Sequence, residues 1–188
     1  MLCNRLPGKK WHARKHGGPK RRLWRKIHLG IDEQTLEVRA IEVTGSHIGD
    51  APILPDLLKQ IPPEQEIGFV TADGAYDTRK CHDAIADRGA QAVIPTRKNA
   101  KLWKPTSVGA VARNEVVRSS KYLGRALWRK WSGYHRRSRV ETKMHCIKLL
   151  GQGLMARDFD RQVAEVQIRA AVLNGYTALG IPRTVTVG

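Results

Sequence analysis

The stretch from Tyr134 to Lys148 limits the possible folds of this chain more than any other. No glycine or proline interrupts it, and Gly133 and Gly151 flank it as the expected start and stop of a helix. We therefore predict one α-helix across the whole stretch. An α-helix turns by about 100° per residue, so side chains three, four and seven residues apart share a face.

One face of the predicted helix carries four polar side chains. Tyr134, Arg137, Glu141 and Lys148 follow one another at steps of 3, 4 and 7 residues, which places them within a wedge of roughly 60°. Helix faces that pack on a core are normally apolar, so this face is unusual. It could be a functional face, or it could be the solvated charged side of a basic surface helix. Spacing alone leaves both interpretations open.

A second polar position follows a short apolar run. Residues 67–72 are compatible with a buried strand, and Asp73 comes directly after them. In α/β proteins, ligands bind just beyond the carboxyl ends of such strands. The alternative is an aspartate that caps the following helix, which is a common use of this residue. Taken alone, the position of Asp73 favours the capping interpretation.

Together the two positions resemble the signature of bacterial insertion-sequence transposases of the DDE type. The pattern Tyr-x2-Arg-x3-Glu-x6-Lys between Tyr134 and Lys148 is similar to the family motif around the third metal-binding carboxylate. Residues 71–77 (TADGAYD) are similar to the motif around the second. The likeness runs from about Lys10 to Pro182 and is closest to the insertion-sequence four/five group. It favours the functional interpretation of both positions.

The resemblance implies a DNA transposition reaction, in which water attacks at the transposon end and the freed 3′-OH then attacks target DNA. Asp73 and Glu141 would be the catalytic carboxylates that hold Mg²⁺ or Mn²⁺, the cations that suit oxygen ligands. Four further residues would support the site through phosphate contacts and packing. The phosphate contacts would come from Arg137 and Lys148, and the packing or hydrogen bonds from Tyr76 and Tyr134.

The pattern of the whole chain predicts an α/β fold. The expected elements are strands at 23–31 and 36–43 joined by a turn at 32–35, a helix at 50–61, a strand at 67–72, a helix at 75–87, a strand at 90–95, and helices at 134–148 and from Phe159 to about Gly180. This order is similar to the ribonuclease-H-like mixed sheet with flanking helices of these transposases. By resemblance, three acids converge beside that sheet, and Asp73 and Glu141 would be two of them.

The first aspartate of the family, which lies on the first strand, has no counterpart in this sequence. No acidic residue precedes Asp32, which lies at the tip of the predicted hairpin. We therefore expect the first strand to be missing, leaving two strand edges unpaired. The predicted organisation is a basic irregular arm at 1–22, a catalytic domain at 23–182 and a tail at 183–188. Such a chain would be the C-terminal part of a longer transposase, and we expect it neither to cut DNA nor to fold robustly.

Charge predicts the class of partner. The net charge is +17 and the isoelectric point about 10.4, which calls for a polyanion. No apolar run is long enough to span a membrane, and no apolar face accompanies the N-terminal basic cluster, so nucleic acid is expected rather than a membrane. The resemblance implies transposon ends and target DNA as partners, a homo-oligomer at full length, and a bacterial cytoplasmic, nucleoid-associated location. The alternative is a non-catalytic basic protein that binds DNA or RNA.

The segment from Arg97 to Ser132 is basic and carries three tryptophans, Trp103, Trp128 and Trp131. Aromatic rings among cations suit nucleic-acid contact through stacking and cation–π geometry. The alternative is that the tryptophans pack a peripheral segment. The sequence leaves both possibilities open.

Overall fold

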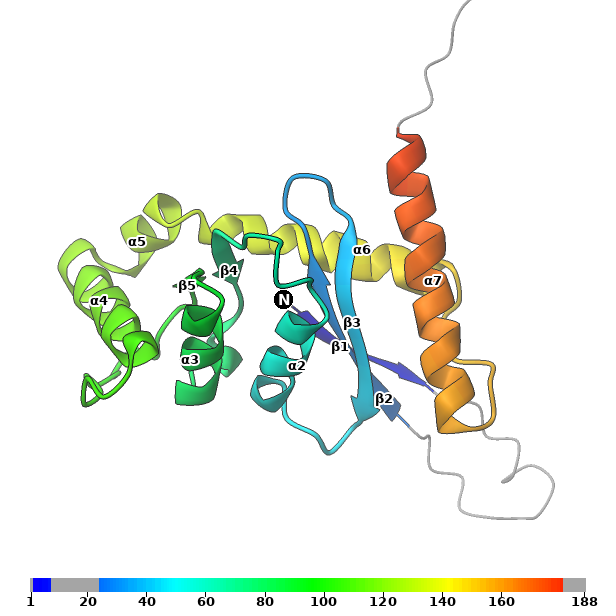
Figure 1. Ribbon diagram of the computed structural model, residues 1–188, viewed down its shortest axis with the longest axis horizontal. Helices are drawn as coiled ribbons and strands as arrows, with labels where there is room; N and C mark the ends of the chain where they lie inside the picture. The colour runs from blue at the N-terminus through cyan, green and yellow to red at the C-terminus, as the bar shows by residue number, and fades with distance from the viewer. Residues whose placement is uncertain (1, 8–23, 181–188) are drawn as a thin grey trace, which may run out of the picture.

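Two small β-sheets and the helices around them make up the computed structural model, which describes residues 2–7 and 24–180 (Figure 1). The strands are β1 (Leu2–Pro7), β2 (Trp24–Ile31), β3 (Val38–Gly45), β4 (Phe69–Thr71) and β5 (Gln91–Val93). The first sheet is antiparallel with the order β1-β2-β3, and the second is the parallel pair β4-β5. The mixed α/β class is therefore confirmed.

The β2–β3 hairpin confirms the two predicted strands and the turn between them. Ile27 and Val43 face each other across the ladder and are both buried, as the alternating sequence requires. Asp32 shapes the turn, because its Oδ1 accepts hydrogen bonds from the backbone N–H groups of Gln34 and Thr35, both at 2.8 Å. These hydrogen bonds, led by the one from Thr35, lower the pKa of Asp32.

Strand β1 corrects the prediction of a wholly irregular arm and of an unpaired edge on β2. It pairs antiparallel with β2, from Leu2 opposite Leu29 to Pro7 opposite Trp24. Leu6 is buried in the core beneath this sheet. Pro7 comes at the end of the strand, where a missing N–H disturbs the ladder least. The expectation that this edge of β2 has no partner strand is therefore wrong. A β-ladder is formed by backbone N–H and C=O groups, so β1 can pair without a particular side-chain pattern. The rest of the predicted arm, and the tail at 183–188, lie outside the described residues.

The second sheet is covered by short helices. They are the 3₁₀ helix η1 (Ala51–Ile53), α2 (Leu54–Lys59), the 3₁₀ helix η2 (Gly74–Tyr76) and α3 (Arg79–Asp87). The helix predicted at 75–87 is thus two elements. The break comes at Thr78, whose side chain caps α3 by accepting from the Cys81 N–H. Ile85, Leu54, Val70 and other apolar side chains of these elements form one buried core.

Two helices without a counterpart in the prediction follow β5. They are α4 (Val108–Leu123) and α5 (Arg125–Trp131), and α4 packs against α3. Ser107 caps α4 by accepting from the Ala110 N–H. Gly124 joins α4 to α5 with a φ of +79°, a conformation that favours glycine. The polar composition of this segment hid its helices, because only a narrow stripe of α4 is buried.

A long helical run closes the fold. It comprises the 3₁₀ helix η3 (Tyr134–Arg137), α6 (Ser138–Leu149) and α7 (Phe159–Leu179). The single helix predicted at 134–148 is therefore wrong in its first turn, which is 3₁₀. Helix α6 runs from the end of α5 past the first sheet to the α7 side (Figure 1). Val140, Met144 and Ile147 of α6 join the core of that sheet.

Helix α7 confirms its predicted core face. Val166, Ala170 and Leu173 are buried against the first sheet, and the Asn174 side chain exchanges two hydrogen bonds with the backbone of Val38, at 2.7 and 2.9 Å. Phe159 is the exception to the prediction, since it is 39% exposed at the start of the helix. None of the helices in the described part of the chain combines the length and apolarity that crossing a bilayer requires.

Candidate functional site

A groove of about 730 Å³ lies where three distant segments meet. Its lining includes Ile31 and Asp32 from the hairpin, Thr71 from the end of β4, and Arg137 and Val140 from η3 and α6. Strand β4 also contacts η3 directly. The two sequence motifs therefore approach each other at this groove, with Thr71 representing one and Arg137 the other.

Asp73 lies two residues beyond the end of β4 and begins the η2 turn. Its Oδ1 accepts a hydrogen bond from the Ala75 N–H at 2.8 Å, so the capping interpretation of this residue is confirmed. The side chain is half-buried. Within the described part of the chain, Oδ2 of Asp73 accepts no hydrogen bond, which leaves one carboxylate oxygen for another ligand. Capping and ligand binding are therefore compatible at this position.

Glu141 lies in the first turn of α6 and pairs with Arg137. The distance from Arg137 Nη2 to Glu141 Oε1 is 2.6 Å, which confirms that Glu141 is helical and that Arg137 shares its face. The pair remains open to solvent, with the Arg137 side chain 21% and the Glu141 side chain 48% exposed. A carboxylate in the first turn of a helix is also favoured by the helix dipole.

Tyr134 supports Arg137 from the side. The Arg137 guanidinium lies 6.0 Å from the centre of the Tyr134 ring, and that ring lies 6.2 Å from the ring of the buried Trp128. The guanidinium of Arg129 lies over the same ring at 5.5 Å. These contacts link α5 to the start of α6. Tyr134 thus packs beside the Arg137–Glu141 pair, and its support of a catalytic site stays a prediction.

The remaining two predicted residues lie apart from this pair. The Tyr76 side chain is fully buried in the core of the second sheet, where it packs among apolar side chains. Lys148 is half-buried in the last turn of α6. Seven residues separate it from Glu141, a rise of about 10 Å along the helix, so it does not touch Arg137 or Glu141. Whether Asp73 and Glu141 share one metal ion stays a prediction.

The chemistry of the donors suits a hard divalent cation, although the carboxylates are few. Asp73 and Glu141 offer carboxylate oxygens, which Mg²⁺ and Mn²⁺ prefer. Among the residues that the structure describes, no cluster of three or more histidine, cysteine, aspartate or glutamate side chains could hold a metal ion. The fit therefore rests on these two carboxylates.

Two long-range contacts tie the hairpin tip to η3 and the start of α6. The Arg136 guanidinium lies 2.9 Å from Glu33 Oε1, and Arg139 donates to the Glu33 backbone carbonyl at 2.6 Å. More than a hundred residues separate these partners. No local pattern in the sequence signals such a contact. Its effect is to hold one wall of the groove against another.

A buried polar cluster between α3 and α4 also lacks a signal in the sequence. Asp77 accepts hydrogen bonds from Arg113 at 3.0 and 3.1 Å and from His82 at 3.2 Å, and Arg113 stacks on the Trp103 ring at 4.1 Å. Burial raises the pKa of Asp77, but the hydrogen bonds from His82 and Arg113 outweigh it and leave the pKa below its ordinary value. This cluster locks α4 onto α3.

The cluster also shows which of the three tryptophans pack within the fold. Trp103 packs between cationic and imidazole groups, and Trp128 is buried, so the packing interpretation is confirmed for both. Trp131 is 71% exposed and remains accessible to a ligand.

Comparison with protein families gives one match, to a family described as the transposase DDE domain, over residues 3–174. The match covers most of the chain and includes both motifs and the helices α4 and α5. A comparison with solved structures finds no match.

Proposed function

The chain belongs to the transposase DDE domain family, and on that premise we propose that the groove beside Thr71 and Arg137 is where DNA is cut and joined. The function of the family is DNA transposition, so the chain is a transposase domain that cleaves and transfers DNA strands. The observation that carries the proposal is the Arg137–Glu141 pair, which stays open to solvent. Arg137 lines the groove together with Thr71, whereas Asp73 and Glu141 are not among its lining residues. A buried pair could not exchange its partner for a substrate.

Asp73 and Glu141 would hold the metal ions in this proposal, each through a carboxylate oxygen. When bound, Mg²⁺ or Mn²⁺ lowers the pKa of the attacking water and stabilises the charge on the leaving oxygen. Glu141 would keep its orientation through the hydrogen bond from Arg137 at 2.6 Å. Asp73 would keep its orientation through the Ala75 N–H at 2.8 Å.

Arg137 would also hold the scissile strand. Its planar guanidinium has five N–H donors, of which the Glu141 contact uses one, so others can bind phosphate oxygens. The Tyr134 ring lies 6.0 Å from this guanidinium, within reach of a cation–π contact. Lys148, two helical turns beyond Glu141, would contact a phosphate outside the reaction centre. Tyr76 would support the Asp73 turn from the core below it.

A ribonuclease-H-like arrangement is our proposal for the fold as a whole. It is supported by the antiparallel order β1-β2-β3, the parallel pair β4-β5 and the position of Glu141 on a later helix. We further propose that transposon ends and target DNA are the partners, that the transposase acts as a homo-oligomer, and that it works in the bacterial cytoplasm at the nucleoid.

A nicking assay on supercoiled plasmid DNA with Mn²⁺ tests the proposed function against the expectation from the sequence that this chain does not cut DNA. The variants Glu141→Gln and Asp73→Asn should each lower the nicking rate by more than about 100-fold. Loss of a residue that only supports a metal ligand costs less, about 10–100-fold. The matched control is Glu115→Gln, an exposed glutamate on α4 that should nick at the wild-type rate. DNA affinity should change little in all three.

Two results would contradict the proposal. Unchanged nicking by Glu141→Gln would remove Glu141 from the reaction. A wild-type protein that binds DNA but shows no metal-dependent nicking would favour a basic nucleic-acid-binding protein without catalysis.

A further inference from the structure

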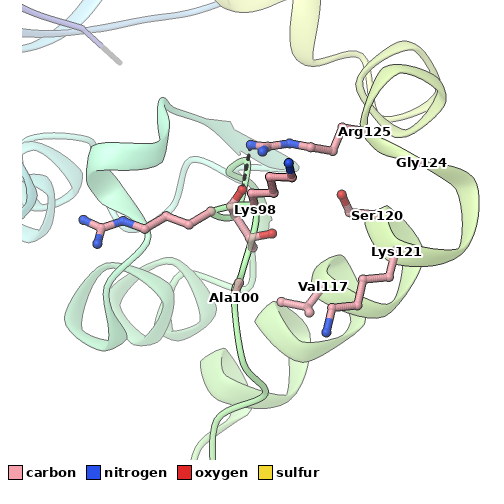
Figure 2. A pocket seen from close by; sticks show the side chains of 9 residues that line it. Lys98, Ala100, Val117, Ser120, Lys121, Gly124 and Arg125 are labelled. Carbon is pink, nitrogen blue, oxygen red and sulfur yellow. Dashed lines mark hydrogen bonds between the residues drawn. The ribbon is translucent and has the colours of Figure 1, made fainter.

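A second, smaller pocket of about 210 Å³ lies away from the groove, between the loop after β5 and the corner of α4 and α5 (Figure 2). Four cationic side chains line it: Arg97, Lys98, Lys121 and Arg125. The hydroxyl of Ser120 adds a hydrogen-bonding group, and the described lining contains no carboxylate. The pocket is several times larger than the roughly 30 Å³ that one water occupies in the liquid, so a phosphate group fits.

The pocket is built by the fold rather than by mobile surface chains alone. Arg125 Nη2 donates to the Thr96 backbone carbonyl at 2.9 Å, which anchors the start of α5 to the loop after β5. Figure 2 shows the head groups of Lys98 and Arg125 pointing toward one another, with the Ser120 hydroxyl facing the same space. Gly124 forms the tight corner at a φ of +79°.

The charges in this pocket lack compensation by the protein. Neither Lys98 nor Lys121 forms an ion pair within the described part of the chain. The like charges of Lys98 and Arg125, whose head groups face each other in Figure 2, repel. An anion between them would remove this repulsion. An ammonium, a guanidinium and a hydroxyl around one space are the donors that phosphate oxygens accept from.

We propose that this pocket binds one backbone phosphate of DNA outside the catalytic groove. The inference rests on the proposed function for its choice of DNA as the source of the phosphate. Two exposed aromatic side chains on the same helices favour a long polyanion over a free ion: Tyr122 is 90% and Trp131 is 71% exposed. Exposed aromatic rings beside cations suit nucleic acid and give a free phosphate nothing to contact. The α4–α5 unit thus holds DNA in addition to bracing the fold.

The test is fluorescence anisotropy with a labelled DNA duplex, titrated at several salt concentrations between about 50 and 200 mM. The variant Lys98→Gln/Lys121→Gln neutralises the pocket without touching the bond from Arg125 to Thr96. The matched control is Lys59→Gln/Lys80→Gln, which removes the same charge from two exposed lysines on α2 and α3. Thermal melts of all proteins check that the fold is kept.

The loss of one phosphate contact should lower the slope of log affinity against log salt by about 0.9. At about 0.1 M salt this corresponds to roughly eightfold weaker binding. The control should keep the wild-type slope. If the pocket variant melts early, the single variant Lys98→Gln, in an exposed loop, replaces it and should still weaken binding relative to Lys80→Gln.

A second arm distinguishes DNA from free phosphate. Melting temperatures are measured in rising inorganic phosphate for the wild type and the pocket variant. Equal DNA slopes for pocket variant and control would overturn the inference, even if inorganic phosphate stabilised the wild type more. That result would leave the proposed function intact, because the proposed function is tested separately, by the loss of nicking in Glu141→Gln. A wild type that binds no DNA would overturn both.

Discussion

The pair Arg137–Glu141 and the pair Arg113–Asp77 have similarly short contacts, at 2.6 and 3.0 Å, but they differ in their access to solvent. The side chains of the first pair are 21% and 48% exposed, and those of the second are 4% and 7% exposed. Exposed ion pairs contribute about 0.2–1 kcal/mol, whereas removing one partner of a buried pair costs about 3–5 kcal/mol. The same two chemical groups can therefore serve a ligand in one place and the fold in another.

The surroundings explain this difference. Both Asp77 oxygens are taken by Arg113, and His82 adds a third hydrogen bond. Arg113 is itself held by the Trp103 ring and by the Lys101 carbonyl. Glu141 has a single partner in the described structure, Arg137, so its second oxygen can accept a ligand. Accessibility, more than charge, marks the carboxylate that can act on a substrate.

The largest expected effect comes from the buried pair. Asp77→Asn should lower the free energy of unfolding by about 3–5 kcal/mol, because it leaves the Arg113 charge buried without a counter-ion. Urea denaturation measures this change. The matched control is Asp87→Asn at the end of helix α3, which begins two residues after Asp77. This substitution of an exposed aspartate should change stability by less than about 0.5 kcal/mol. Equal effects of the two substitutions would show that the buried cluster is not structural.

Acid should reveal the same pair in the wild type. The pKa of Asp77 is lower in the folded chain than in the unfolded chain, so the unfolded state binds more protons in acid. The resulting stability is complete above the unfolded pKa of about 3.9 and is lost as the pH falls through the folded pKa. Asp77→Asn should therefore lose less stability than the wild type over that range.

The close approach of α4 to α3 gives a smaller expected effect. A Cβ added at Gly109 would come within 2.5 Å of the His82 carbonyl carbon and the Asp83 carboxylate. Gly109→Ala should thus push the helices apart and cost about 1–3 kcal/mol in a thermal melt. Gly175→Ala in α7 is the matched control, because nothing lies within 4 Å of its added Cβ. That substitution should stabilise the helix by about 0.5–1 kcal/mol, and a destabilising effect there would contradict the comparison.

The smallest effect on stability should come from the exposed pair. Arg137→Gln should change the free energy of unfolding by less than about 1 kcal/mol, since solvent already screens the contact with Glu141. The same substitution should weaken plasmid nicking, because it removes both the support of Glu141 and a phosphate contact. Arg161→Gln, on an exposed pair with Asp158, is the control for both measurements. If Arg137→Gln lowered the free energy of unfolding by several kcal/mol, the Arg137–Glu141 pair would be structural, like the Arg113–Asp77 pair.

Much of the candidate site was predictable because it is local. The helical spacing that joins Arg137 to Glu141 is four residues, and Asp73 lies two residues beyond the end of β4, so short-range geometry sets both. The same holds for the hairpin with Asp32 at its turn. The helices α4 and α5 were not predicted, because Arg113 and Asn114 occupy buried positions on α4 where a sequence pattern requires apolar residues. Their polar groups are satisfied only by partners elsewhere in the chain.

The sequence by itself determined the chemistry of the motifs, the family-like order of carboxylates and the strong positive charge. Tertiary structure alone decided which aspartate is buried, with Arg113 reaching Asp77 across 36 residues. It also decided that β1 pairs with β2, that Glu33 ties the hairpin to α6, and that Lys98 meets Arg125 in one pocket. The physical reason is that periodicity and capping act over a few residues. Burial and charge compensation depend instead on segments that only the folded chain brings into contact.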